Sequence, residues 1–395
     1  MPWPTPSPMS QRLEFIQAVL HRKAPQSIKD VAAQFGVSEK TAHKWLTRFE
    51  RGGPEALGDR SRAPHVPPHQ VAPAQQAAIC ALRQAHPTWG ARKLLSVLQT
   101  DRPAERWPAP STITRVLKRH DLVAPRARHA RDRAGWATTH LTAPTGPNDV
   151  WAADFKGQFR VGSGEYCYPL TVTDLHARYL VGVEVQRSVA SEPAEAAFQQ
   201  LFATYGLPRV IRTDNGVPFG LPGALGGLSR LAVWWVRLGI RPERIRKGHP
   251  QDNGAHERMH RTLKAETTRP AAATLAAQQA RLRAWQATYN DTRPHEALGQ
   301  TPPARHYAPS SRPLPRRLPP VEYPAHYELR EVSSCGTISW RGVPLFLSKV
   351  LTGEYVGLYE SAEGVWTVTY GPLTLGTYDE SLMQFLDSVS WTAPV

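Results

Sequence analysis

The sequence predicts a multidomain protein, with all-α helix-turn-helix modules at the N-terminus, an α/β core in the middle and a small β-barrel at the C-terminus. The chain has 395 residues, which is too long for one ordinary core. Its hydrophobic pattern changes from helical to extended near residue 149, and Pro-rich stretches interrupt it. Its net charge is +15, and the excess of basic residues lies ahead of residue 325, because residues 325–395 hold only three basic residues against eight acidic ones.

This charge predicts a polyanionic partner, because Lys and Arg side chains that neutralise phosphates release counterions. Nucleic acid is favoured over a membrane surface, since the sequence has no apolar run of about 18 residues and no signal-peptide core. We therefore expect a soluble, cytoplasmic protein. Cys80, Cys167 and Cys335 lie too far apart in the sequence to form a disulfide framework or a paired-cysteine zinc site, so we expect ordinary buried thiols.

Residues 1–62 are predicted to form a helix-turn-helix DNA-binding domain. A helix over 11–23 is followed by a short helix, a turn at Gly36 and a helix capped by Ser38. This last helix has cations on the face that a recognition helix presents to DNA, although a solvated charged face would look the same. The outward residues are Lys40, Thr41, Lys44 and Arg48.

Residues 63–123 are predicted to form a second helix-turn-helix domain. A Pro-rich break precedes helices over 74–86 and 90–98, and a third helix is expected to be capped by Ser111. Its outward cations would either contact DNA or form a plain charged face; they are Arg115, Lys118 and Arg119. Residues 124–147 form a basic linker that can follow a phosphate backbone by charge alone, with Arg126 and Arg128 as candidate contacts.

Residues 148–308 are predicted to form the α/β core. Three strands come first, and helices then alternate with two short strands, which is typical of a mixed sheet flanked by helices. The strands are expected over 150–161, 166–175, 178–186, 209–215 and 242–248, and the helices over 192–206, 228–239, from Asn253 and over 272–290. A linker at 309–325 leads to 326–395, where short strands with Gly turns predict the small β-barrel.

Three acidic residues of the core are candidates for a metal centre. Asp154 lies in the first strand, Asp214 ends the fourth, and Glu257 falls in the first turn of the helix after the last strand. In a sheet of this type the first and fourth strands are neighbours, so the two aspartates would be adjacent and the glutamate helix would approach them. Phosphodiester cleavage by two metal ions needs carboxylates that converge in this way, and Mg²⁺ prefers oxygen ligands.

Taken singly, each of these acids has a plainer interpretation. Asp154 could be a strand-end residue, Asp214 a turn former before Asn-Gly, and Glu257 a partner of the helix dipole. Asp252 is the nearby acid that we interpret as a helix cap, and His260 is expected to be a surface histidine. The joint arrangement in basic surroundings favours the metal site.

The segments WAADFKGQF, IRTDNGVPF and KGHPQDNGAHERMHRTLKAE resemble, in this order, the three blocks of the Asp-Asp-Glu integrase core. That core is found in retroviral integrases and in bacterial insertion-sequence transposases. YNDTRPHEALGQTPPARHY is similar to the block that follows it, and the resemblance extends over about residues 11–310. It implies a ribonuclease H-like core in which Asp154, Asp214 and Glu257 are catalytic residues and ligands of two Mg²⁺ ions, with Mn²⁺ as a substitute.

The resemblance further implies a DNA transposase that cleaves transposon ends and joins the freed 3′ hydroxyl to target DNA. Arg261 and Lys264 share the helix face of Glu257 and would contact the double-stranded DNA. Because two ends must be joined, a homodimer or a larger assembly is expected. The alternatives are a ribonuclease H-like nuclease without strand transfer, and a helix-turn-helix regulator with an inactive core.

The chain departs from the family pattern at two places. The interval from Asp214 to Glu257 is longer than usual, and the Gly-rich stretch GLPGALGG is a candidate surface insertion that accounts for it. Related proteins often use a small barrel at the C-terminus to contact DNA, but the acidic charge of residues 325–395 argues against phosphate binding there. Contact between protomers is the other interpretation.

Overall fold

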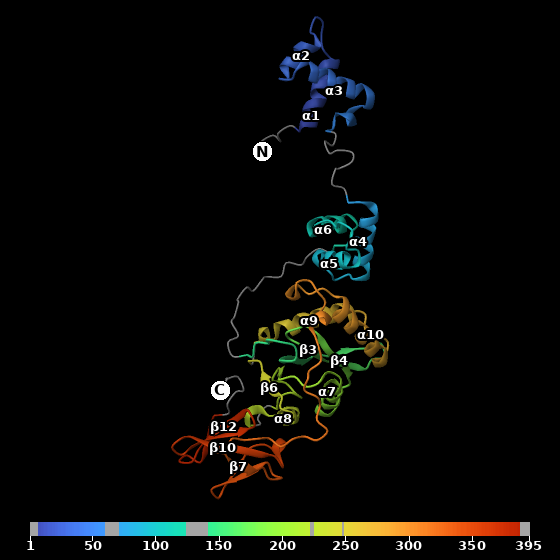
Figure 1. Ribbon diagram of the computed structural model, residues 1–395. Coiled ribbons are helices and arrows are strands. Elements are labelled where there is room, and N and C mark those ends of the chain that lie inside the picture. Colours follow the sequence, from blue (N-terminus) through green and yellow to red (C-terminus); the bar gives the residue numbers. More distant parts are fainter. Residues whose placement is uncertain (1–6, 60–70, 124–140, 222–224, 247–248, 388–395) are drawn as a thin grey trace. The chain divides into compact units, whose positions relative to one another are not determined.

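The computed structural model describes residues 7–59, 71–123, 141–221, 225–246 and 249–387. The chain divides into two compact units, Met1–Val71 and Ala72–Val395. Figure 1 shows the elements of both units. Arg126 and Arg128, the candidate DNA contacts of the basic linker, lie outside the described residues. Within the described residues, no helix is both long and apolar enough to cross a membrane.

The first unit is the predicted helix-turn-helix. Its helices are α1 (Pro8–Leu20), α2 (Ile28–Gln34), α3 (Glu39–Gly52) and the 3₁₀ turn η1 (Pro54–Leu57). Ser38 caps α3 as expected, because its side chain accepts a hydrogen bond from the amide of Thr41. The helices pack around a small apolar core that includes Ile16 and Trp45.

The second unit opens with α4 (Pro73–Ala85), α5 (Ala91–Asp101) and α6 (Pro110–Arg119), which match the three predicted helices. The predicted cap was wrong. Ala109 is the N-cap of α6 without a side-chain hydrogen bond, and Pro110 is the first helical residue. Proline at this position has its φ angle already set for the helix, so Ser111 lies inside the first turn rather than ahead of it.

The core is a mixed sheet with helices on both faces (Figure 1). Its strands are β1 (Val150–Phe155), β2 (Phe159–Arg160), β3 (Tyr166–Asp174), β4 (Leu180–Gln186), β5 (Val210–Thr213) and β6 (Arg241–Arg244). β3 pairs with β1 and β4 in antiparallel fashion, whereas β1–β5 and β5–β6 are parallel. The first and fourth predicted strands are therefore neighbours, as expected.

The two faces of the sheet bury alternate residues of each strand. Trp151 and Ala153 pack on the side of α7 (Ser191–Tyr205) and α8 (Arg230–Arg237). Val150 and Ala152 point to the other side, which α9 (Gly254–Thr267) and α10 (Leu275–Ala287) cover. By the same alternation Asp154 points toward α9. Short helical turns complete the core: η2 (Leu225–Gly227), η3 (Pro250–Asn253), the π-turn η4 (Thr288–Thr292), η5 (Glu296–Leu298) and η6 (Pro303–His306).

The C-terminal strands do not close into the predicted barrel within the described residues. An antiparallel sheet in the order β13-β12-β11-β10-β7 has two open edges, and β8–β9 is a separate hairpin. The strands are β7 (Glu328–Glu331), β8 (Thr337–Trp340), β9 (Val343–Phe346), β10 (Tyr355–Ala362), β11 (Val365–Tyr370), β12 (Leu373–Asp379) and β13 (Gln384–Asp387), with η7 (Lys349–Leu351) after β9.

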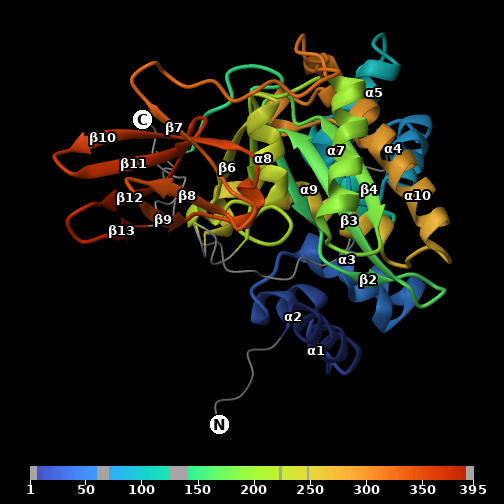
Figure 2. The same ribbon diagram turned by 90° about the horizontal axis from the view of Figure 1, so that it is seen from below.

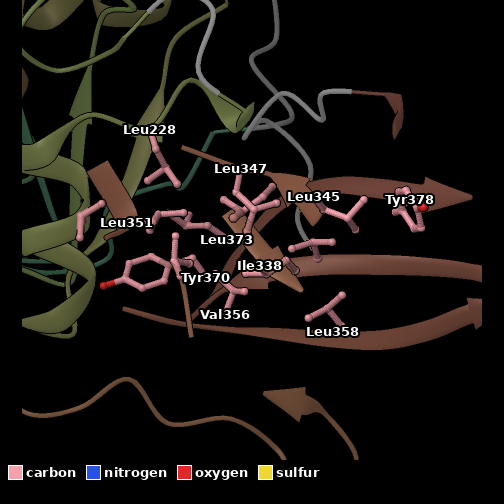
Figure 3. Close-up of a cluster of buried hydrophobic side chains, with 14 of the residues drawn as sticks. Leu228, Ile338, Leu345, Leu347, Leu351, Val356, Leu358, Tyr370, Leu373 and Tyr378 are labelled. Carbon is pink, nitrogen blue, oxygen red and sulfur yellow. The ribbon is translucent and has the colours of Figure 1, made fainter. Parts of the chain in front are cut away.

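The apolar face of this sheet packs against the β8–β9 hairpin and η7, and residues of the core of the same chain complete the buried cluster. Leu228, which Figure 3 labels, joins the buried cluster of the C-terminal strands, and so do Ala232 and Val236 of α8. Arg237 of α8 also pairs with Glu354 at 3.2 Å. Figure 2 shows the C-terminal strands beside α8. The described end of the Gly-rich stretch takes part as well, because Leu225 packs on the same cluster.

Candidate active site

The register of the sheet brings two of the three predicted acids to neighbouring positions. In the parallel pair β1–β5, Val150 lies opposite Val210 and Ala152 opposite Arg212. Extending this register by two residues places Asp214 opposite Asp154, at the carboxyl ends of both strands. The Asp214 carboxylate accepts a hydrogen bond from the amide of Gly216 at 3.1 Å, so the turn that follows β5 orients it.

The third acid approaches from α9. Glu257 lies in the first turn of this helix, as predicted, and its side chain is exposed. The electrostatics of Asp154 show the proximity of both partners. Burial, followed by the negative charge of Asp214 and to a lesser extent that of Glu257, raises the pKa of Asp154 to about 7. The three acids thus influence one another across the edge of the sheet, which favours the binding of cations there.

Two lysines accompany the acids. Lys156 lies two residues after Asp154 and Lys264 lies on α9. Burial and the charge of Lys264 lower the pKa of Lys156, while Asp154 and Glu257 oppose this shift. Lys264 and Arg261 are both exposed, as a DNA contact requires. The sequence interpretation missed Lys156, although it follows Asp154 by only two residues.

A buried hydrogen-bonded cluster lies directly behind Asp154. The hydroxyl of Thr171 donates to the backbone carbonyl of Asp154 at 3.0 Å. It also lies 2.8 Å from Nε2 of His256 and 2.6 Å from Nε2 of His260. Since the single hydroxyl proton goes to the carbonyl, both imidazoles must donate from Nε2. This Thr171–His256–His260 cluster therefore fixes α9 to β3 and β1 beside the acids.

The cluster corrects the sequence interpretation of His260, which is 5% exposed and not a surface residue. Its Nδ1 lies 3.6 Å from Oδ2 of Asp154. With Nε2 protonated, Nδ1 and the carboxylate are two acceptors that face each other, an arrangement that favours a proton or a cation between them. Ligand atoms of Asp154, His256 and His260 all lie within 4.8 Å of one another. Burial lowers the pKa of His256 to about 3 and also lowers the pKa of His260, so both imidazoles are neutral.

The plainer interpretation of Asp252 was also wrong. Its carboxylate does not cap α9 but accepts hydrogen bonds from Nε and Nη2 of Arg246, at 3.0 and 2.9 Å. Asn253 is the N-cap, without a side-chain hydrogen bond. The interpretation of Asp252 as a cap was wrong because Arg246, in the loop ahead of α9, offers its carboxylate a stronger, charge-assisted partner than the helix amides do.

Replacing Thr171 by valine is expected to lower the free energy of unfolding by about 2 kcal/mol, because the Asp154 carbonyl and two imidazole nitrogens lose their buried partner. Thr173 provides a matched control on the same strand: it is buried, and its hydroxyl has no hydrogen-bond partner among the described residues. Thr173→Val should leave stability nearly unchanged. Urea denaturation measures both, and equal effects of the two substitutions would refute the assignment of the cluster.

The pKa of Asp154 predicts how the stability of the metal-free protein depends on pH. The folded state binds this proton more tightly than the unfolded chain, whose carboxyl titrates near 3.8. The proton on Asp154 therefore stabilises the folded state at low pH, and this contribution to the free energy of unfolding is lost as the pH rises from about 4 to about 7. Relative to Asp154→Asn, the wild-type chain should therefore lose roughly 4 kcal/mol over this window. Urea titrations in EDTA test this, and parallel pH profiles would contradict it.

The predicted DNA contacts of the first unit lie on α3 but differ in their surroundings. Lys40 and Lys44 are exposed. The hydroxyl of Thr41 instead lies 2.9 Å from that of Ser38 in the helix cap. Arg48 and Lys44 both lie over the ring of Trp45, at 4.9 Å from its centroid. Among these candidates, Lys40 thus has the side chain that interacts least with the rest of the domain.

The candidates of the second helical domain are all on α6. Arg115, Lys118 and Arg119 are exposed. Arg115 makes a hydrogen bond to Thr112 at 3.4 Å within the same helix. Their exposure agrees both with a face that contacts DNA and with a plain charged face.

Comparisons with known sequences and structures match the same regions. Residues 144–250 and 238–303 each match a family described as an integrase core domain. Residues 11–65 match a helix-turn-helix domain, and residues 41–117 match a homeodomain-like domain.

Two curated relatives come from bacterial insertion elements. The IS476 uncharacterized 39.2 kDa protein of Xanthomonas euvesicatoria is 28% identical over 244 residues, which cover 61% of this chain and 67% of that protein. The IS407 uncharacterized 31.7 kDa protein of Burkholderia multivorans is 29% identical over 190 residues, covering 48% of this chain and 65% of that protein. The aligned segments thus span about two thirds of these relatives.

Solved structures with detectable similarity include two viral integrases. The HTLV-2 integrase catalytic core domain in complex with magnesium aligns with 42% of this chain and 100% of its own, at 17% identity and a TM-score of 0.34. The simian T-cell lymphotropic virus intasome in complex with a PP2A regulatory subunit aligns with 75% of this chain and 97% of its own, at 15% identity and a TM-score of 0.36. The chain thus contains integrase core domain matches over residues 144–303 with helix-turn-helix matches ahead of them, and it is similar to proteins of bacterial insertion elements.

Proposed function

We propose that this protein is a DNA transposase that cleaves the ends of an insertion element and transfers the freed 3′ hydroxyl to target DNA. One observation carries the proposal. Asp154 and Asp214 lie at the carboxyl ends of neighbouring parallel strands, and both Asp214 and Glu257 act on the pKa of Asp154. A cluster of carboxylates that raises the proton affinity of one member is the donor set that suits Mg²⁺ or Mn²⁺.

In this proposal Asp154, Asp214 and Glu257 hold two divalent ions. Such a pair of ions stabilises both the attacking and the leaving oxygen of a phosphodiester displacement. The Thr171–His256–His260 cluster keeps Asp154 and α9 in place. Lys156 and Lys264 offer positive charge to the DNA phosphates beside the acids.

The helix-turn-helix domains would bind the terminal repeats, through the α3 and α6 residues named above and through Arg126 and Arg128. The joining of two ends to one target calls for a homodimer or larger assembly on double-stranded DNA. We also propose the domain limits given by the sequence: 1–62, 63–123, 148–308 and 326–395, with linkers at 124–147 and 309–325.

The decisive experiment incubates the full chain with labelled DNA from the ends of its element, target DNA and magnesium. Cleaved ends together with longer joined products support a transposase. Cleaved ends that never join would instead identify a nuclease, and binding without any nicking would identify a DNA-binding regulator. A parallel reaction in EDTA measures the part of the product that depends on metal.

Lys40→Ala is expected to weaken the binding of element ends roughly tenfold, since one good contact to a base or phosphate contributes about 1–3 kcal/mol. Lys29→Ala is the matched control, because Lys29 is an exposed lysine of the same domain on α2. Fluorescence anisotropy with a labelled end fragment measures both. If the two variants bind equally well, α3 does not read the DNA.

A further inference from the structure

A second polar site lies on another face of α9. A cavity of about 270 Å³ opens between the second helical domain and the core. Ala255, Arg258, Met259 and Thr262 line it, and this spacing puts them on one side of α9. Glu257, Arg261 and Lys264 follow the same helical spacing on the opposite side. The cavity is therefore separate from the three acids.

The two walls of the cavity are held together by specific contacts. Arg92 of α5 pairs with Glu296 at 3.0 Å, and the hydroxyl of Ser96 donates to the carbonyl of Gln300 at 2.7 Å. The ammonium of Lys93 donates to the carbonyl of Pro294. Lys93 thus projects from the second helical domain into a cavity whose other charged residues belong to the core.

Positive charge dominates the lining. Lys93, Arg178, Arg258 and Arg293 face one carboxylate, that of Glu296. Glu296 is already paired with Arg92 outside the lining, and Arg293 is paired with Glu266 at 2.9 Å. Arg178 and Arg258 form no ion pair within the described part of the chain. The residues that line the cavity therefore include more positive charges than negative ones.

These cations repel one another. Burial and then the charge of Arg293 lower the pKa of Lys93 to about 8. Burial, followed by the charges of Lys93, Arg293 and Arg178, lowers the pKa of His295 to about 3. Nε2 of this neutral histidine is buried and finds no hydrogen-bond partner among the described residues. An anion in the cavity would relieve the repulsion and could supply that missing partner.

We propose that the cavity binds a phosphate group, and that this phosphate belongs to the DNA backbone. Guanidinium groups present paired donors that match phosphate oxygens, and Arg178 and Arg258 are free of competing carboxylates within 4 Å in the described residues. The assignment of the phosphate to DNA rests on the proposed function. Since Lys93 and the arginines come from different domains, a bound phosphate would join the second helical domain to the core, away from the reacting phosphodiester.

The first test uses inorganic phosphate and the full chain in EDTA. Phosphate should raise the Tm of the wild-type protein above its value in chloride of equal ionic strength, and Arg178→Gln/Arg258→Gln should abolish this difference. Arg283→Gln/Arg305→Gln is the matched control, because both arginines are exposed, lie outside the cavity and give the same change of charge. A Tm that phosphate leaves unchanged in the wild-type protein would overturn the site.

The second test identifies the source of the phosphate. The affinity for duplex DNA of arbitrary sequence is measured over a series of salt concentrations, again in EDTA. The cavity variant should show a log–log slope about 0.9 less steep than the control variant, which corresponds to the loss of one phosphate contact. Equal slopes, with the phosphate effect on Tm intact, would assign the cavity to a free phosphate compound and overturn the assignment to DNA. Neither test needs cleavage, so an inactive core would leave both results standing.

Discussion

Asp154→Asn is expected to lower magnesium-dependent cleavage and joining of DNA by roughly a thousandfold or more. Metal ions at a phosphodiester contribute several kcal/mol of charge stabilisation in the transition state, and each 1.4 kcal/mol corresponds to about tenfold in rate. Asparagine keeps the shape of the side chain but removes the negative charge that Asp214 and Glu257 act upon. Gel assays with labelled element ends measure the loss.

Asp149→Asn is the matched control for this prediction. Asp149 lies just ahead of the same strand, at its opposite end, and accepts hydrogen bonds from the amides of Thr145 and Gly146. An asparagine side-chain oxygen can still accept these bonds, so activity should persist. Both variants should bind end DNA like the wild-type chain, because the proposed DNA-reading helices lie elsewhere. Persistent cleavage by Asp154→Asn would show that Asp154 is not a ligand of the proposed metal centre.

The strands that carry the acids could be predicted because their sequence is periodic. β1 begins with four buried apolar residues ahead of Asp154, β5 runs directly into Asp214, and the switch from helical to extended pattern marks where the core begins. The order of the elements then places the two strands side by side, as the structure has them. Local pattern and topology were sufficient to predict that Asp154 and Asp214 lie at neighbouring strands, whereas their role as metal ligands stays a prediction.

The cluster behind Asp154 could not be predicted in the same way, because its members meet only through the tertiary structure. Thr171 is one polar residue in a buried strand, and His256 and His260 are separated from it by most of the core. One signal was available: two histidines four residues apart share a helix face. The buried side of α9, which includes Met259 and Leu263, is that same face.

The C-terminal barrel is not confirmed, for a related reason. The pattern correctly predicted short strands, but closure depends on what covers their apolar face. Here Ile338 of β8 and Val236 of α8 belong to the same buried cluster as the five-stranded sheet. An apolar helix face and an apolar sheet face are each visible in the sequence, whereas their pairing is not.

Arg212→Met is expected to lower the free energy of unfolding of the core by about 3 kcal/mol, because the buried carboxylate of Glu243 then keeps only the more distant Arg241, at 3.6 Å, as a cationic partner. Arg212 and Glu243 face each other across β5 and β6, with Nε 2.7 Å from Oε2, and both are less than 9% exposed. Glu243 also accepts from the amide and hydroxyl of Thr142, at 2.8 and 2.6 Å. Urea denaturation measures the loss.

Arg209→Met is the control, because Arg209 is exposed and pairs with Asp149 at 3.4 Å. Such a surface pair contributes at most about 1 kcal/mol. The double variant Arg212→Met/Glu243→Leu should recover part of the stability, since it removes both buried charges. Recovery should stay incomplete, because the amide of Thr142 then has no carboxylate to bind. Equal stability of Arg209→Met and Arg212→Met would show that the pair does not stabilise the core.

This ion pair also bears on the proposed metal centre. Arg212 precedes Asp214 by two residues, so it fixes β5 against β6 close to the end of the strand where Asp214 lies. Loosening that register would let Asp214 move away from Asp154 and would weaken the binding of cations by the acids. We therefore expect Arg212→Met, at a temperature where it remains folded, to need more magnesium than Arg209→Met for half-maximal cleavage. Identical magnesium requirements would show that the ion pair affects only the stability of the core and not the binding of cations.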